Sequence, residues 1–119
     1  MAVTGAVTVV IWHNPRCTTS RKTLDLLRAH GIEPEIRLYL QDPPDRAELR
    51  AVLKKLGRPA ADLLRWKEAE VPAGLTRASG EEAILDALIA HPRLIERPVV
   101  IHGDIARIGR PPEAVLSIL

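Results

Sequence analysis

The chain of 119 residues contains no phenylalanine and only one cysteine, Cys17. Aromatic residues make up 3% of the chain, so the core must be built from aliphatic side chains, and aromatic stacking surfaces for single-stranded nucleic acid are not expected. A single cysteine excludes an internal disulfide and a cysteine-rich zinc site. The histidines lack a metal-ligand spacing, so we expect no metal site. Cys17 is therefore either an inert buried thiol or a reactive one.

Long hydrophobic runs and a strong charge imbalance are also absent. The apolar run at residues 7–12 is far shorter than the roughly 20 residues of a membrane-spanning helix, and residues 1–6 lack the pattern of a signal peptide. The net charge is +2, without a long basic run, which favours anionic ligands weakly and nucleic acid not at all. We expect one domain over residues 1–119 that is cytoplasmic, monomeric and not bound to a membrane.

Apolar periodicity and turn residues predict the order of the elements. Short apolar or alternating runs predict strands at residues 7–12, 35–40, 98–101 and 105–108. Helical spacing of apolar residues predicts helices within residues 17–31, 45–57, 59–64, 79–92 and 111–119. Capping boxes are expected at Asp45 with Glu48 and at Ser79 with Glu82. The order predicts an α/β fold, a thioredoxin-like, glutaredoxin-type four-stranded mixed sheet with a helical insertion at about 45–92 between its βαβ and ββα halves.

Cys17 lies where the first predicted strand gives way to the first predicted helix. Unpaired N–H groups and the positive end of a helix stabilise a thiolate at this place, and Arg16 and Arg21 add positive charge. We therefore interpret Cys17 as a nucleophile. His13 could orient this loop, support the thiolate or be a solvated turn residue. Ser20 occupies the position of a second cysteine, so an oxidised sulfur at Cys17 would need an external thiol to release it.

Three arginines stand at loop positions further along the chain: Arg65, Arg97 and Arg110. Taken singly, each would be interpreted as a solvated side chain. The planar guanidinium is nevertheless suited to a tetrahedral oxyanion, because it can bind two oxygens at once. The bond between Arg97 and Pro98 is a candidate cis peptide, since only bonds that precede proline adopt cis at low cost.

Four motifs together resemble the ArsC family, the glutaredoxin-coupled arsenate reductases, and in particular its short chromosomal members. They are His-Asn-Pro-Arg-Cys-Thr-Thr-Ser-Arg at 13–21, Leu-Leu-Arg at 63–65, Leu-Ile-Glu-Arg-Pro-Val-Val at 94–100 and Arg-Ile-Gly-Arg-Pro-Pro-Glu at 107–113. The resemblance runs from about residue 7 to 119. It implies a thioredoxin-like fold with a helical insertion.

The resemblance also implies a role for each matched position. Cys17 matches the catalytic cysteine, and His13 matches the histidine at the start of the active loop. The arginines at 65, 97 and 110 match those that hold the oxyanion, and Pro98 matches the cis-proline that faces the cysteine. Arg16 stands where the plasmid-borne enzymes of the family carry a small residue, and it could alter the anion site.

The implied activity is reduction of arsenate to arsenite, an arsenic detoxification step that proceeds through an adduct on Cys17. Glutathione is then a co-substrate and glutaredoxin a partner, and no cofactor is bound. One alternative is a glutathione-dependent thiol reductase without physiological arsenate activity. Another is an Spx-like regulator that binds RNA polymerase, which is disfavoured because Ser20 replaces the second cysteine of the switch typical of those regulators.

Overall fold

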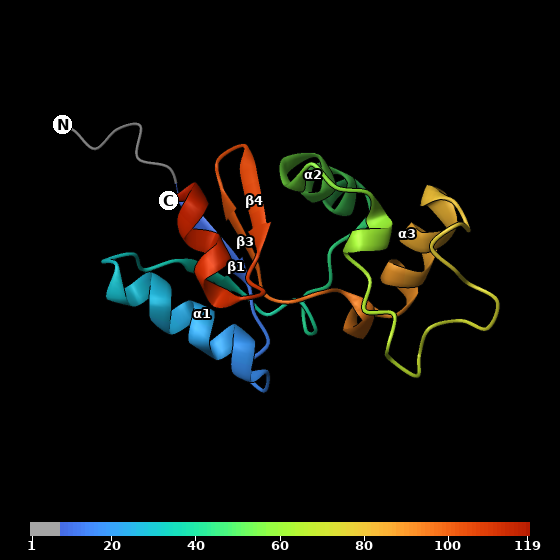
Figure 1. Cartoon of the computed structure of the whole chain (residues 1–119), viewed down its shortest axis with the longest axis horizontal. Coiled ribbons are helices and arrows are strands. Elements are labelled where there is room, and N and C mark those ends of the chain that lie inside the picture. The colour runs from blue at the N-terminus through green and yellow to red at the C-terminus, as the bar shows by residue number, and fades with distance from the viewer. Residues whose placement is uncertain (1–7) are drawn as a thin grey trace. The chain divides into compact units, whose positions relative to one another are not determined.

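The structure, a computed structural model, describes residues 8–119 (Figure 1). The chain divides into two compact units. The first combines the N-terminal segment up to Arg37 with Arg97–Leu119, and the second is the continuous segment Leu38–Glu96. The first unit therefore carries the predicted βαβ and ββα halves, and the second carries the helices between them.

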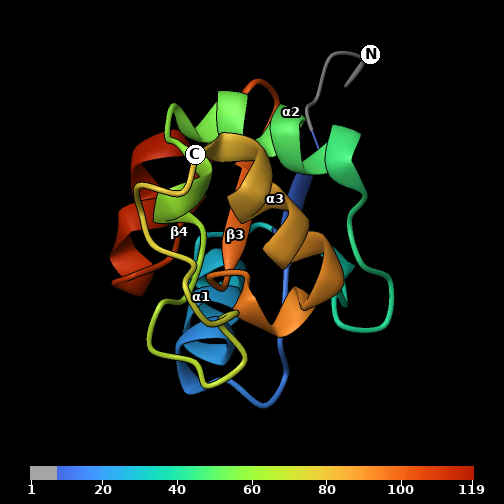
Figure 2. The ribbon, with the colours of Figure 1, turned by 90° about the vertical axis from the view of Figure 1, so that its right-hand side faces the viewer.

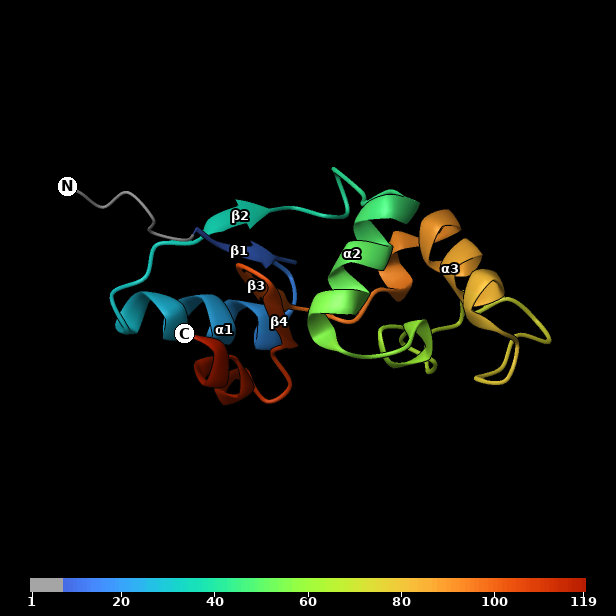
Figure 3. The same ribbon diagram turned by 90° about the horizontal axis from the view of Figure 1, so that it is seen from above.

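A four-stranded sheet forms the centre of the first unit. Its strands are β1 (Val9–Trp12), β2 (Glu35–Arg37), β3 (Val99–His102) and β4 (Ile105–Ile108), in the order β2-β1-β3-β4. Strand β2 runs parallel to β1, whereas β1 with β3 and β3 with β4 are antiparallel. The sheet lies beside α1 (Thr18–Ala29), the helix between β1 and β2, as Figure 3 shows. The predicted thioredoxin-like mixed sheet is confirmed.

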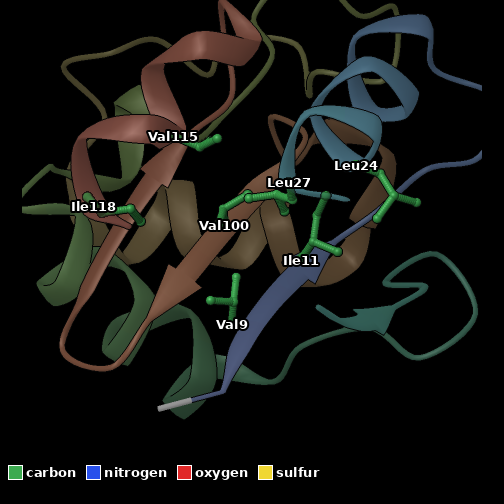
Figure 4. Packing of buried hydrophobic residues seen from close by; sticks show 7 residues of the cluster. All are labelled: Val9, Ile11, Leu24, Leu27, Val100, Val115 and Ile118. Carbon is green, nitrogen blue, oxygen red and sulfur yellow. The ribbon is translucent and has the colours of Figure 1, made fainter. Parts of the chain in front are cut away.

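One face of this sheet is covered by α1 (Thr18–Ala29) and by the 3-10 helix η3 (Pro112–Ile118) (Figure 3). Because Ile11 pairs with Val100 in the β1–β3 register, both side chains point to the same face. Aliphatic side chains from both strands and both helices form the core there (Figure 4): Val9, Ile11, Leu24, Leu27, Val100, Val115 and Ile118. Burying each of the larger ones contributes roughly 1.5–3 kcal/mol, and this packing holds α1 against the sheet.

The second unit consists of short helices and connecting turns (Figure 2). Its elements are α2 (Arg46–Leu56), η1 (Ala60–Asp62), α3 (Glu81–Ala90) and η2 (Pro92–Leu94). The predicted capping box at Asp45 is confirmed, since its side chain accepts from Glu48 N and the Glu48 side chain from Asp45 N. Gly57 ends α2 in the left-handed conformation that glycine adopts readily. None of the helices over residues 8–119 has the length and apolar character needed to cross a membrane.

Some predicted boundaries are wrong. Strand β2 ends at Arg37 rather than at residue 40, because the chain turns and Leu38 O accepts from the N–H groups of Gln41 and Asp42, at 2.9 Å each. Strand β1 is described from Val9, and residue 7 of the predicted strand lies outside the described residues. The last helix forms as the tighter 3-10 type.

The predicted capping box at Ser79 is also wrong. Gly80 is the N-cap of α3, and Ser79 Oγ instead accepts a hydrogen bond from Thr76 N at 2.8 Å. The carboxylate of Glu82, its expected partner, pairs with Arg50 of α2 at 2.7 Å. A local turn and an ion pair thus use the two side chains that the sequence pattern assigns to the cap.

Candidate active site

The thiol of Cys17 stands at the N-terminus of α1. Its backbone is extended, with φ −92° and ψ 122°, and its side chain makes no capping hydrogen bond. Cys17 N donates to Asn14 O at 3.0 Å, and Cys17 O accepts from Arg21 N at 3.0 Å. The thiol is half-buried. The backbone is therefore held in place while Sγ remains available beside the unpaired N–H groups of the first helical turn, where a thiolate is stabilised.

One of the predicted arginines, Arg110, contacts this thiol and is bonded to a second, Arg97. Arg110 Nη2 lies 3.7 Å from Cys17 Sγ and donates to it, while Arg110 Nε donates to Arg97 O at 3.0 Å. The hairpin of β3 and β4 explains the encounter, because Arg97 precedes the first strand and Arg110 follows the second, so both lie at the same end. Arg97 Nε is buried and has no hydrogen-bond partner within the described part of the chain. A buried N–H of this kind suits an external acceptor, since leaving it unsatisfied is costly.

Pro98 lies at this end of the hairpin, directly before β3. The Arg97–Pro98 peptide bond is cis, as the sequence suggested, and so is the bond between Arg110 and Pro111. Gly109 N donates to Pro98 O at 2.9 Å. A Cβ at Gly109 would lie 2.9 Å from Pro98 Cγ and 2.8 Å from Thr23 Oγ1, so only glycine fits there without a shift. This close approach was missed from the sequence, in which Gly109 reads as an ordinary loop glycine.

His13 is buried at the exit of β1, with 5% of its surface exposed, so a solvated turn histidine is the wrong interpretation. Its Nδ1 lies 2.6 Å from Ser20 Oγ, which also accepts a hydrogen bond from Asn14 N at 3.0 Å. Ser20 is completely buried, and Nδ1 is the acceptor within reach of its hydroxyl proton. We therefore assign the hydroxyl as donor to Nδ1, which places the ring proton on Nε2.

The electrostatic surroundings keep His13 neutral. Burial lowers the pKa of His13, and the positive charges of Arg28 and Arg21 lower it further, against a small opposite effect of Asp25. At neutral pH the ring is therefore mostly uncharged and contributes little cationic stabilisation to a thiolate. The geometry instead fits the other predicted role, orientation of the loop that leads to Cys17.

Arg65 belongs to the second unit, where two carboxylates hold it. Its Nη1 lies 2.5 Å from a carboxylate oxygen of Glu68, and its Nε lies 3.4 Å from one of Glu96. Its backbone N donates to Leu94 O at 2.7 Å, next to the bridge between Leu64 and Ile95. Both ion pairs were missed from the sequence, although the spacing of three residues between Arg65 and Glu68 is a usable signal.

Further positive charge borders Cys17 on its own unit. Arg21 Nη1 donates to Pro15 O at 2.8 Å and its Nη2 to Thr18 Oγ1 at 3.3 Å. Arg16 is exposed, and its backbone N donates to Asn14 Oδ1 at 3.0 Å. The first turn of α1 carries no acidic residue. Throughout residues 8–119, no three side chains among His, Cys, Asp and Glu gather where they could hold a metal ion.

Comparisons with known proteins place this geometry in a family. The model of the ArsC family matches residues 12–118. The protein named "Uncharacterized protein YfgD" of Escherichia coli (strain K12) is 50% identical over 115 residues, which cover 93% of this chain and 96% of that protein. An arsenate reductase of Haemophilus influenzae is 44% identical over 117 residues, 95% of this chain and 100% of its own. A solved arsenate reductase from Vibrio cholerae superposes with a TM-score of 0.86 at 40% identity and covers 96% of this chain and 99% of its own. The family model matches most of the chain and these relatives cover nearly all of it, so the chain belongs to the ArsC family.

Proposed function

We propose that the protein is an arsenate reductase that uses the thiolate of Cys17 as its nucleophile. The observation that carries the proposal is the contact of 3.7 Å between Arg110 Nη2 and Cys17 Sγ at the N-terminus of α1. A guanidinium in this position stabilises the thiolate and also offers N–H donors to an anion that approaches it. Relatives of the same family that carry the name arsenate reductase support the choice of substrate.

The oxyanion is held, in this proposal, by Arg97 and Arg110, with Arg65 as the third arginine. Arsenate is a tetrahedral anion, and planar guanidinium groups bind two of its oxygens at once. The buried Nε of Arg97 gains a partner when the anion binds, which favours binding. Arg65 is oriented by Glu68 and Glu96, so its guanidinium is held in one direction before the anion arrives.

The first chemical step is attack of the Cys17 thiolate on arsenic. A sulfur–arsenic bond forms, and one arsenate oxygen leaves as water after taking up two protons. Negative charge shifts from sulfur to the arsenate oxygens during this step. Arg110 and Arg97 offer N–H donors to that charge, which lowers the barrier.

Reduction then needs two external thiols. Glutathione adds to arsenic through its sulfur, with loss of a second water. The thiolate of glutaredoxin attacks the glutathione sulfur, a disulfide forms, and the electron pair of the broken arsenic–sulfur bond stays on arsenic, which becomes As(III). Water finally releases arsenite and regenerates Cys17. The chain cannot supply the second thiol, because Cys17 is its only cysteine and Ser20 is engaged with His13.

His13 acts in this scheme as a positioning residue. Its neutral ring and Ser20 tie the start of the loop to α1, and Asn14 N is bound to the same hydroxyl. Glutathione serves as co-substrate, and no resident cofactor is needed. A free thiol suits the reducing cytoplasm, where we place the protein as a monomer.

The proposal is tested by arsenate-dependent oxidation of NADPH in an assay that contains glutathione, glutaredoxin and glutathione reductase. Cys17→Ser is expected to abolish turnover. Arg97→Ala and Arg110→Ala should each weaken arsenate binding by roughly 1.5–3 kcal/mol, because each removes charge-assisted hydrogen bonds. Arg93→Ala is the matched control, since Arg93 is an exposed arginine that lies 3.9 Å from Glu70. Turnover no higher than background with the unchanged protein would refute the proposal.

A glutathione-dependent thiol reductase is the second candidate. It is favoured by the exposed Arg16 directly beside Cys17, which offers charge to a substrate larger than arsenate. Reduction of a glutathione mixed disulfide without arsenate turnover in the same assay would support this candidate. The regulator is disfavoured, because Ser20 carries a hydroxyl instead of a thiol and therefore cannot form the disulfide of a two-cysteine switch with Cys17.

A further inference from the structure

We propose that Arg16 is a specificity-determining residue, which selects acidic thiols over neutral and basic thiols as reaction partners of Cys17. The inference rests on the proposed function, in which an external thiol must approach the site of Cys17. It goes beyond that function because it assigns the choice among thiols to one side chain and to one property, their charge.

The loop fixes the backbone of Arg16 next to the thiol. Asn14 accepts two hydrogen bonds from the backbone of this loop. Its side-chain Oδ1 accepts from Arg16 N and its backbone O accepts from Cys17 N, at 3.0 Å each. The side chain of Arg16 is exposed, whereas its backbone is anchored. The guanidinium therefore stays within one side-chain length of the path to Cys17 while its charged end remains in solvent.

The other arginines beside Cys17 are engaged within the protein. Arg21 donates to Pro15 O and Thr18 Oγ1, and Arg110 donates to Arg97 O and to the thiol itself. For the guanidinium of Arg16, the described residues contain no hydrogen-bond or ion-pair partner. Of the exposed arginines beside Cys17, Arg16 is thus the one whose guanidinium an incoming group meets without displacing an internal hydrogen bond.

No carboxylate of the first turn of α1 offsets this charge. We take the charge of the incoming thiol to lie about 8 Å from the guanidinium and the effective dielectric constant to be about 40 to 80. At low salt, the attraction or repulsion then changes the local concentration of the thiol roughly two- to fivefold per unit charge. Two thiols that differ by two charges should then differ by roughly four- to 25-fold because of Arg16.

Thiol exchange at Cys17 measures this selection without arsenate. Cys17 is first converted to its mixed disulfide with 4-thiopyridine. An added thiolate attacks the sulfur of Cys17, a new disulfide forms, and the electron pair of the broken bond leaves with the released 4-thiopyridone, whose absorbance gives the rate. The thiols are 3-mercaptopropionate, 2-mercaptoethanol and cysteamine, and each rate is divided by the rate of the same thiol with free 4,4′-dithiodipyridine. This division removes differences in intrinsic reactivity.

The unchanged protein should react fastest with 3-mercaptopropionate and slowest with cysteamine. In Arg16→Gln the ratio of these two normalised rates should fall roughly four- to 25-fold, and in the unchanged protein it should shrink as salt is added. Lys22→Gln is the control, because Lys22 is an exposed cation of α1 five residues from Cys17. It should leave the ratio nearly unchanged.

Three results would overturn the assignment: no charge preference in the unchanged protein, an unchanged ratio in Arg16→Gln, or an equal fall in Lys22→Gln. Because the exchange contains no arsenate, a failure of arsenate turnover refutes the proposed function alone. A normal turnover together with any of these three results refutes the role of Arg16 alone.

Discussion

Replacing Ser20 by alanine should destabilise the first unit strongly for so small a change. The hydroxyl is completely buried, bonds to His13 Nδ1 at 2.6 Å and accepts from Asn14 N at 3.0 Å. The substitution removes both bonds and leaves two polar atoms in a site with little access to water. Each unsatisfied group costs about 1–3 kcal/mol, so for two groups we expect a loss of about 2–6 kcal/mol. For a chain of this size the midpoint of thermal unfolding should fall by about 8–24 °C.

Urea unfolding followed by tryptophan fluorescence measures this loss. Trp12 lies buried in β1, whereas Trp66 belongs to the second unit, so a Trp66→Phe background restricts the signal to the first unit. Ser117→Ala is the matched control. Its hydroxyl is exposed and donates to Ala114 O at 3.0 Å, so the loss should stay within about 0.5 kcal/mol.

Equal losses of unfolding free energy in Ser20→Ala and Ser117→Ala would refute this prediction. The large loss is expected because the hydrogen bonds of Ser20 are buried, whereas that of Ser117 is exposed. The rate of Cys17 alkylation by iodoacetamide is a second measurement. It should change in Ser20→Ala, since the loop from His13 to Cys17 loses its attachment to α1, and it should stay the same in Ser117→Ala.

Three further predictions concern pH, close packing and capping. The pKa of His13 is lowered in the folded protein, so the unfolded chain binds more protons at this residue. The free energy of unfolding should therefore decrease as pH falls from about 6.5 through the pKa of His13 in the folded protein. Titration of its ring protons by NMR checks this, and a midpoint at or above about 6.5 would contradict it. Gly109→Ala should cost about 1–3 kcal/mol in thermal unfolding, because the added Cβ lies 2.8 Å from Thr23 Oγ1, and an unchanged midpoint would show that the contact relaxes freely. Asp45→Ala should cost about 1 kcal/mol through loss of the capping box, whereas Asp45→Asn should restore most of it if capping is the cause.

The elements of the fold could be predicted where local signals decide the structure. The capping box at Asp45 and the apolar runs of β1 and β3 are examples, and the order of elements then led to the mixed sheet. The box at Ser79 failed because two interactions outside the motif used its members, a turn with Thr76 and an ion pair of Glu82. Tertiary partners of this kind leave no mark in a local pattern.

The candidate site could be predicted in part for the same reason. The position of Cys17 at a helix start follows from neighbouring residues, and the meeting of Arg97 with Arg110 follows from the hairpin between them. The hydrogen bond between His13 and Ser20 could not be predicted, because it depends on the angle between the loop and α1. That angle is determined by the packing of the core. The ion pair between Arg65 and Glu96 likewise could not be predicted, because the two residues are far apart in the sequence and only the folded chain brings them together.

The division of the chain has a consequence for its synthesis. The second unit is continuous, so it can fold as soon as Glu96 has left the ribosome, whereas the first unit must wait for Arg97–Leu119. Strand β1 can pair with β3 only after the segment between them has been synthesised. Cys17 is thus translated well before Arg110, whose guanidinium it contacts in the folded protein. A nascent chain that does not yet include Arg110 therefore carries the thiol without this guanidinium.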